Sequence, residues 1–186
     1  LDGGDGADSL TGGTGDDVYL FDAGDVDSGE RIIENASEGT DVISFDENVD
    51  FSLLPANDFN EIEQIRFAGS SKTGTFTGGQ LTGETILLTE TGSGTNKLVI
   101  DVESGTTATF TNLTASTFDN GSDTITINGT DGGNEVITGP NLVTSINGGT
   151  GDDNITGGSG NDTINGQGGD DTMDGGGGTN TLSYSD

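Results

Sequence analysis

Residues 148–165 consist of two consecutive nine-residue segments, GGTGDDNIT and GGSGNDTIN. If the chain is cut every nine residues between Thr130 and Ser183, the eighth position of each segment is apolar, in Ile137, Ile146, Ile155, Ile164, Met173 and Leu182. In the last four segments the seventh and ninth positions are polar, which is the alternation of a three-residue strand with one buried face. The remaining six residues, rich in glycine, are typical of turns. The pattern predicts an array of short strands and turns.

A three-residue strand cannot bury its apolar residue alone, so it must stack on copies of itself. If two segments form one coil, residues 18 apart superpose in neighbouring coils, about 4.8 Å apart along the stack. Two apolar ladders then face each other: Ile137 with Ile155 and Met173, and Ile146 with Ile164 and Leu182.

The same superposition brings acidic residues together in consecutive turns. It places Asp153 beside Asp171, and Asp162 beside Asn180. Two such carboxylates repel each other unless a cation lies between them. Ca²⁺ accepts six to eight oxygen ligands in flexible geometry, whereas Mg²⁺ demands octahedral geometry and keeps several waters. The turns therefore predict calcium bound between coils.

The composition excludes several classes of function. The 186 residues include 33 Asp and Glu against 4 Lys and Arg, with no His and no Cys. Catalysis by His, thiolate chemistry, zinc ligation by His or Cys and disulfides are therefore excluded. With a net charge of −29, the chain lacks the basic surface that nucleic-acid binding requires, so this class of function is also excluded. No apolar run reaches the length of a transmembrane segment, so none is expected.

The segments at 148–165 match, at every defined position, the nonapeptide G-G-x-G-x-D-x-(large apolar)-x. The chain thereby resembles the RTX (repeats-in-toxin, hemolysin-type calcium-binding repeat) proteins, as a fragment of a large secreted member. The resemblance implies an all-β fold, a right-handed parallel β-roll with two nonapeptides per coil and Ca²⁺ between adjacent turns. It also implies type I secretion, folding outside the cell and a secreted, extracellular or cell-surface location.

Carried over by position, the resemblance implies a set of calcium ligands in the C-terminal repeats. The carboxylates are Asp153, Asp162 and Asp171, and the turn oxygens are those of Gly148, Thr150, Gly157, Ser159, Gly166 and Gly168. Glu135 and Asn180 stand where the pattern has Asp, and Thr144 replaces it in the segment after Glu135. With sites of the affinity found in extracellular proteins, we expect several ions, about six.

The motif recurs at the N-terminus as GGDGADSLT (3–11) and GGTGDDVYL (12–20), with Asp8 and Asp17 at the ligand position. The match then loosens into a spacer that contains three further candidate ligands, Asp25, Asp27 and Asp41. Asp25, Asp27 and a following Gly form a D-x-D-x-G fragment, but the EF-hand glutamate at position twelve is missing. An ordinary acidic turn is the alternative for this fragment.

The middle of the chain has no nonapeptides, but it is rich in Thr and strand-like. We divide the chain into N-terminal repeats and spacer (1–47), a Thr-rich β segment (48–127) and a C-terminal β-roll (128–186). The simplest interpretation of 48–127 is a calcium-poor continuation of the solenoid; the alternative is an inserted β-sandwich. Helix is expected only as a turn or two between residues 55 and 63.

The chain is not expected to be an enzyme. Glu61 and Glu63 are spaced like a carboxylate pair of a glycosidase, but they alternate with Ile62 and fit the solvated face of a strand. The preferred function is a calcium-folded structural module of an adhesin, surface-layer or matrix protein, whose partners are calcium and neighbouring repeats of the same long chain. End-to-end self-association is a weaker expectation.

Two other functions remain open. The first is a calcium-dependent accessory or secretion domain of a secreted enzyme of the lipase, metalloprotease or epimerase type. The second is an ice- or carbohydrate-binding solenoid. It is the least favoured, because the third position of the segments is irregular, reading Gly132, Asn141, Thr150, Ser159, Gly168 and Gly177.

Overall fold

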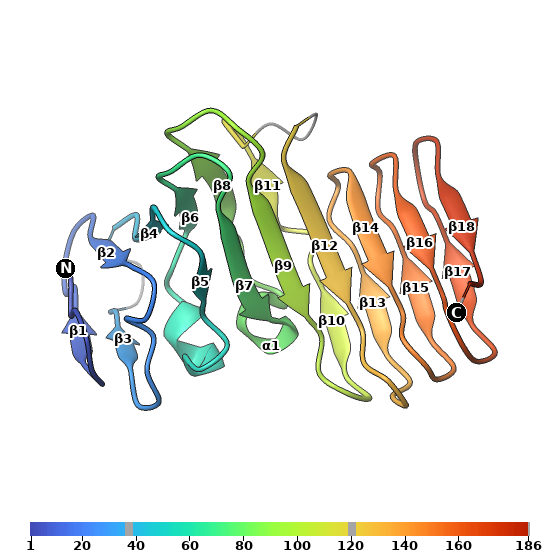
Figure 1. Ribbon diagram of the computed structural model, residues 1–186, viewed down its shortest axis with the longest axis horizontal. Coiled ribbons are helices and arrows are strands. Elements are labelled where there is room, and N and C mark those ends of the chain that lie inside the picture. Colours follow the sequence, from blue (N-terminus) through green and yellow to red (C-terminus); the bar gives the residue numbers. More distant parts are fainter. Residues whose placement is uncertain (36–38, 119–121, 186) are drawn as a thin grey trace.

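The chain forms an elongated parallel β-solenoid (Figure 1). The computed structural model describes residues 1–35, 39–118 and 122–185. Within them, all pairings between the named strands are parallel, as expected when each coil lays its strands on those of the coil before. The predicted all-β, parallel roll is therefore confirmed.

Three walls enclose the interior. The five-stranded wall contains β2 (Val18–Phe21), β4 (Val42–Phe45), β6 (Gln64–Phe67), β8 (Leu87–Glu90) and β11 (Thr114–Ala115). The seven-stranded wall contains β5 (Val49–Asp50), β7 (Thr73–Thr77), β9 (Lys97–Asp101), β12 (Thr124–Asn128), β14 (Thr144–Asn147), β16 (Thr163–Asn165) and β18 (Thr181–Ser183).

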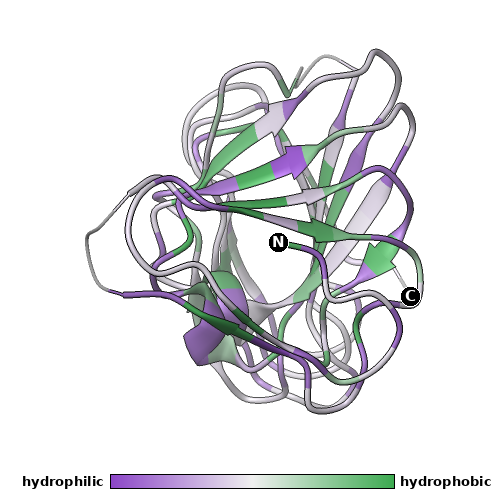
Figure 2. Cartoon of the chain, turned by 90° about the vertical axis from the view of Figure 1, so that its left-hand side faces the viewer, coloured by the Kyte–Doolittle hydropathy of each residue, from purple (hydrophilic) through white to green (hydrophobic). Residues whose placement is uncertain are grey.

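The third wall is interrupted by two helical turns. It contains β1 (Ser9–Thr11), β3 (Arg31–Ile33), the 3₁₀ turn η1 (Ala56–Phe59), α1 (Gly78–Leu81), β10 (Thr107–Thr109), β13 (Val136–Thr138), β15 (Asn154–Thr156) and β17 (Thr172–Asp174). Figure 2, which looks along the stack from the N-terminal end, shows the coils around a shared interior.

The coils differ in length along the stack. Thr73 pairs with Lys97 and Thr107 pairs with Val136, so the central coils are longer than two nonapeptides. From β13 onward each coil of the third wall has the length of two nonapeptides, as the repeat predicts. The seven-stranded wall joins the middle of the chain to the C-terminal repeats, whereas the five-stranded wall ends at β11. The segment boundaries at residues 47/48 and 127/128 remain a prediction.

The core changes with the coil length. In the central coils it is aromatic, and the rings of Phe51 and Phe76 stack with centroids 4.7 Å apart. In the C-terminal coils each strand contributes one inward residue, and the register confirms both predicted ladders. Ile155 and Ile164 are fully buried there, whereas Leu182 on the last strand is 43% exposed.

Two polar anchors hold the helical turns. Arg31 on β3 forms a two-oxygen ion pair with Asp58 of η1, with N–O distances of 2.8–3.0 Å. Gln80 of α1 is buried, and its amide donates to the carbonyls of Phe51 and Leu54, both at 2.7 Å. The turn η1 lies where helix was predicted. The restriction of helix to residues 55–63 is wrong, since α1 forms a second turn, started by a capping box between Thr77 and Gln80.

Candidate metal centre

A ladder of side-chain acceptors runs along the edges of the walls. The residue directly before a strand, or in one case the first residue of it, donates its N–H to a side chain in the next coil. The residue that carries the accepting side chain directly precedes another strand, and this strand pairs with the strand of the donor. We call this the pre-strand ladder; its donor and acceptor pairs are 8 and 30, 17 and 41, 41 and 63, 72 and 96, 96 and 123, 135 and 153, 144 and 162, 153 and 171, and 162 and 180. Each bond satisfies an amide that the strand ladder does not reach.

In the C-terminal roll the ladder acceptors are the residues that the nonapeptide pattern marks as calcium ligands. Asp171 Oδ1 accepts the N–H of Asp153 at 3.0 Å, and Asp153 Oδ1 accepts that of Glu135 at 2.8 Å. On the other edge, Asp162 Oδ1 accepts from Thr144 at 2.9 Å and Asn180 Oδ1 accepts from Asp162 at 2.8 Å. The predicted superposition of these residues is confirmed.

A ladder bond to an aspartate uses one carboxylate oxygen and leaves the second. One carboxylate oxygen is buried without a hydrogen-bond partner in the ladder acceptors Asp153, Asp162 and Asp171 and in the ladder donors Asp8 and Glu135. Burying an unpaired carboxylate oxygen is costly, and native structures rarely leave one without a partner, water or ion. Carboxylate oxygens are also the ligands that Ca²⁺ prefers. These residues therefore fit a hard divalent cation.

The electrostatics agree with that donor set. Burial, together with the neighbouring Glu135 and Asp171 carboxylates, raises the pKa of Asp153 to about 6. Burial also raises the pKa of Asp162. The sequence has no Lys or Arg after Lys97. A cation supplied from outside the chain would therefore relieve the repulsion within the roll.

The first glycine of each repeat is required by the ladder carboxylate. A Cβ at Gly148 would lie 2.6 Å from Asp153 Oδ2, and a Cβ at Gly157 would lie 2.6 Å from Asp162 Oδ2. Gly166 has the same relation to Asp171. These glycines thus lie beside the unpartnered oxygens, where the repeat pattern places the turn oxygens of the metal site.

The third-position candidates serve contacts between turns. The carbonyl of Thr150 accepts the N–H of Gly132, and that of Gly168 accepts the N–H of Gly151 at 2.7 Å. Ser159 lies exposed beside Gly177 of the next coil. Their role as calcium ligands remains a prediction.

The N-terminal candidates meet partners that the repeat pattern does not mark. The partner of Asp8 is Glu30, which is 1% exposed. The N–H of Asp8 donates to Glu30 Oε2 at 2.8 Å. Asp17 lies with Asp41 and Glu34, and one carboxylate oxygen of each falls within 4.8 Å of the others. The coils here are longer than two nonapeptides, so no repeat phase points to Glu30 or Glu34. Their only sequence signal is an acidic residue beside a short apolar strand.

Glu34 is further tied to its surroundings. Its Oε1 accepts the hydroxyl proton of buried Tyr19, and its Oε2 accepts the N–H of Gly13 at 3.2 Å. Burial, and then the bond to Glu34, raise the pKa of the Tyr19 hydroxyl. The phenol therefore stays protonated and donates to the carboxylate.

The D-x-D-x-G fragment forms a turn between β2 and β3. Asp25 is buried, and its Oδ2 accepts the N–H of Asp22 at 2.7 Å. The carbonyl of Asp27 accepts the N–H of Glu30 at 3.0 Å. These bonds give Asp25 a structural role within its own turn, and calcium ligation by Asp25 and Asp27 remains a prediction.

A second ladder lies at the fifth repeat position, which the nonapeptide pattern leaves undefined. Asp152 Oδ1 accepts the N–H of Asp170 at 2.9 Å, and Asn161 Oδ1 accepts the N–H of Thr179 at 2.8 Å. Asp152 in turn donates its N–H to Asn134 at 3.1 Å. The preference for Asp or Asn at this position thus has a structural cause.

Comparison with known families agrees with the ladder geometry. The RTX calcium-binding nonapeptide repeat matches in four copies, over residues 1–25 and 147–182. The chain carries RTX calcium-binding repeats. The matched ranges include Asp8 and Asp17 at one end and Asp153, Asp162 and Asp171 at the other. Four of these five residues carry the unpartnered oxygens, so the RTX repeats and the candidate metal centre coincide.

The RTX match does not extend over residues 26–146. No curated protein and no solved structure matches the chain. Among the described residues, no helix is long and apolar enough to cross a membrane.

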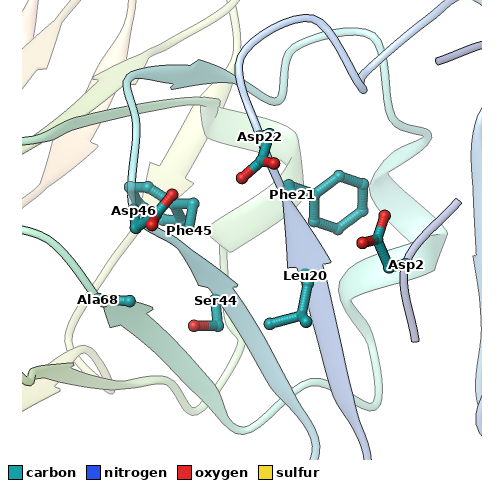
Figure 3. A pocket seen from close by; sticks show the side chains of 8 residues that line it. All are labelled: Asp2, Leu20, Phe21, Asp22, Ser44, Phe45, Asp46 and Ala68. Carbon is teal, nitrogen blue, oxygen red and sulfur yellow. The ribbon is translucent and has the colours of Figure 1, made fainter. Parts of the chain in front are cut away.

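A hollow of about 200 Å³ opens on the five-stranded wall near the N-terminal end (Figure 3). Phe21 and Phe45 line it together with Leu20, Ser44 and Ala68, and it also has three acidic residues, Asp2, Asp22 and Asp46. Burial, together with repulsion from Asp46 and other acids, raises the pKa of Asp22. The hollow lies apart from the RTX ladder carboxylates.

Proposed function

We propose that this chain is a calcium-folded structural module of a secreted or cell-surface protein of the adhesin, surface-layer or matrix type. The observation that carries the proposal is the set of unpartnered, buried carboxylate oxygens on the pre-strand ladder of the RTX repeats. Calcium supplies positive charge there and joins adjacent turns. Extracellular sites bind calcium with Kd values of about 0.1–1 mM, so external calcium fills them.

The energetic argument favours a folding switch. In a few millimolar calcium, each such site adds roughly 1–2 kcal/mol to the free energy of unfolding. About six ions together would rival the whole stability of a small domain, roughly 5–15 kcal/mol. Folding would then follow export, because the cytosol holds little free calcium.

The test is a calcium titration of the chelated protein, followed by far-UV circular dichroism, with magnesium as the control. We expect a cooperative gain of β signal at millimolar calcium and no comparable gain with magnesium. A β signal that is already complete in chelator and unmoved by calcium would refute the proposal.

A non-catalytic role is part of the proposal. Glu63 belongs to the pre-strand ladder, since its Oε2 accepts the N–H of Asp41 at 2.7 Å. This bond explains the presence of Glu63 by a structural role. The spacing of Glu61 and Glu63 therefore does not call for a catalytic role. An accessory domain of a secreted enzyme would use the same calcium chemistry. A catalytic domain encoded next to this segment would favour that alternative.

End-to-end association of separate chains is a weaker part of the proposal. Light scattering in excess calcium tests it, and a monomeric mass would argue against it.

A regular outer face on the seven-stranded wall supports ice binding as a second candidate function. The strand register aligns two outward rows: Thr75, Val99, Thr126, Ser145, Thr163 and Thr181, and Thr77, Asp101, Asn128, Asn147, Asn165 and Ser183. Unlike the third repeat position, these rows are mainly hydroxyl and amide side chains. Asn147 donates to Asn128 at 3.0 Å and Asn128 to Asp101 at 2.8 Å, which makes part of the second row rigid.

The rows contain no aromatic side chain on which a sugar ring could stack, so this face favours ordered water over carbohydrate. Ice-affinity partitioning of the calcium-loaded protein tests the idea. Thr126→Tyr should reduce incorporation into ice, whereas Thr156→Tyr on the third wall should not. Exclusion of the unmodified protein from ice would refute this candidate.

A further inference from the structure

Three asparagine–glycine pairs lie in one row of the seven-stranded wall. Asn128, Asn147 and Asn165 are the last residues of β12, β14 and β16, and the strand register places them side by side (Figure 1). A glycine follows each of them, and in the two repeats of the roll it is Gly148 and Gly166. Such a pair is especially prone to deamidation, because glycine has no side chain to hinder the ring closure that starts the reaction.

The reaction needs no partner besides water. The main-chain nitrogen of the glycine attacks Cγ of the asparagine, a C–N bond forms, and the Cγ–Nδ2 bond breaks. The proton of the attacking nitrogen leaves with the amide group as ammonia. Water then opens the succinimide ring at one of its two carbonyls, which gives aspartate or isoaspartate. Isoaspartate has one additional carbon atom in its main chain, and both products carry a new negative charge.

The repeat imposes the glycine but not the asparagine. A Cβ at Gly148 would lie 2.6 Å from Asp153 Oδ2, and Gly166 has the same relation to Asp171. The preceding residue holds the undefined ninth position of the nonapeptide, and Ser183 occupies the same place in the row on β18. The reactive neighbour is therefore fixed by the fold, whereas the deamidating side chain is particular to these repeats.

The paired strands engage the attacking nitrogens. Gly148 donates its N–H to the carbonyl of Asn165 in the next coil at 2.8 Å, and Gly166 donates its N–H to the carbonyl of Ser183 at 2.9 Å. These bonds hold each nitrogen in the plane of the sheet, while the asparagine side chain stands roughly perpendicular to that plane. The ring cannot close while the strands remain paired.

The asparagine side chains are held as well. Asn147 donates its Nδ2 to Asn128 Oδ1 at 3.0 Å. Asn165 donates its Nδ2 to the carbonyl of Ser185 at 2.9 Å, and its Oδ1 accepts the N–H of Gln167 at 3.2 Å. Attack on Cγ requires these side chains to leave their partners, so the folded wall blocks both reacting groups.

We propose that Asn147 and Asn165 are modification sites that the folded roll keeps closed and that open to deamidation when the roll loses calcium. The inference rests on the proposed calcium-dependent folding and adds a chemical consequence to it. Isoaspartate lengthens the main chain between a strand and the following turn. A carboxylate at position 147 has no proton to donate to Asn128. A chain kept without calcium therefore loses its ability to rebuild the roll.

Peptide mapping by mass spectrometry measures the deamidation rate at each site, at neutral pH, in calcium, in chelator and in denaturant. Conversion in calcium must wait for local opening of the strands, so we expect Asn147 and Asn165 to react at least about tenfold more slowly in calcium than in chelator. Asn154 of β15 is the matched control, because Ile155 follows it, and it should stay intact in all three conditions. Equal rates at Asn147 and Asn165 in calcium and in denaturant would overturn the inference.

The loss of refolding has its own measurement. After long incubation in chelator, calcium is added and the β signal is read by far-UV circular dichroism. The unmodified protein and Asn154→Ser should recover only in the fraction that keeps both amides, whereas the double variant Asn147→Ser, Asn165→Ser should recover fully. Should the double variant not fold in calcium, deamidated chains isolated by ion exchange answer the same question. Complete refolding of those chains would overturn this consequence.

Failure of this inference differs from failure of the proposed function. If the β signal is complete in chelator, and both sites react in denaturant but not in chelator, the proposed function fails and the protection by the fold stands. If chelator abolishes the β signal of the roll while Asn147 and Asn165 stay as intact as Asn154, the inference fails and the proposed function stands.

Discussion

The central coils and the C-terminal roll share one topology but are stabilised by different means. The central coils bury a cluster of phenylalanines, with Phe51, Phe59 and Phe76 all fully buried. The roll directs one apolar side chain per strand inward and has no such cluster. The roll has two walls, whereas the coils before it have three, and it buries fewer apolar side chains than they do. Apolar burial alone therefore supports the centre better than the roll.

The pre-strand ladder differs between the two regions in the same sense. In the centre, Asn96 accepts from Lys72 with its oxygen and donates to Glu90 with its Nδ2, so both ends of the amide are satisfied. In the roll, Asp153 and Asp162 occupy the equivalent positions, and each leaves one buried oxygen without a partner. The amide of Asn96 completes its own hydrogen bonding, whereas the remaining oxygens of Asp153 and Asp162 fit a cation. We therefore expect the roll to depend on calcium more than the centre does.

Removal of calcium gives the largest expected effect. In chelator, the amides of β13 to β18 should exchange with solvent rapidly, while those of β7, β9 and β12 stay protected because the aromatic core does not need the ion. Hydrogen exchange read by mass spectrometry measures this. Equal loss of protection in both regions would remove the distinction between them.

Truncation of the aromatic core should act on the centre in either buffer. Phe76→Ala is expected to lower the free energy of unfolding by about 3–5 kcal/mol, as for other buried phenylalanines. Denaturant unfolding in calcium and in chelator measures the change. Ile164→Val provides a contrast. It should lower the free energy of unfolding by about 0.5–1.5 kcal/mol in calcium and have no effect in chelator, because we expect the roll to be folded only in calcium. A Phe76→Ala effect seen only in calcium would contradict the assignment of the core.

The fifth and sixth repeat positions should differ in their dependence on calcium. Asp171→Ala removes a candidate ligand and a ladder acceptor. The calcium concentration at the midpoint of folding (the calcium midpoint), measured by circular dichroism, should therefore rise markedly. Asp170→Ala removes a side chain of the undefined position and should move the midpoint little. Asp152→Ala, which loses the acceptor for Asp170, should cost about 1 kcal/mol in calcium without altering the number of ions. Equal midpoints for Asp170→Ala and Asp171→Ala would refute the ligand phase.

A smaller effect is expected for pH in the absence of calcium. The pKa of Asp153 is raised from 3.8 to about 6 in the folded chain, so the folded state binds the proton more tightly than the unfolded state. The resulting stability is fully present below the unfolded pKa of about 4 and is lost as the pH rises through about 6. In chelator, lowering the pH from about 6.5 to about 4 should therefore favour folding of the roll and increase the β signal in far-UV circular dichroism, and Asp153→Asn should flatten that dependence. A β signal that falls as the pH is lowered over this interval would contradict the assignment.

The sequence alone determined the roll and most of its candidate site. The nine-residue phase carries the inward apolar position and the ladder Asp together, and a coil of two nonapeptides superposes them by simple repetition. Asp153 with Asp171, and Asp162 with Asn180, follow from this arithmetic without knowledge of any distant part of the chain. Local, periodic information is sufficient because every coil in this part has the same length.

Only the tertiary structure decided the rest. Glu30 and Glu34 meet Asp8 and Asp17 across coils longer than two nonapeptides, and α1 forms where Gln80 can bond to carbonyls of the preceding coil. Likewise, the bond from the N–H of Gly105 to Glu135 spans the long coil from β10 to β13. Such partners depend on how far each irregular coil travels before it pairs. No repeat in the sequence encodes that length, because these coils have no constant nine-residue phase.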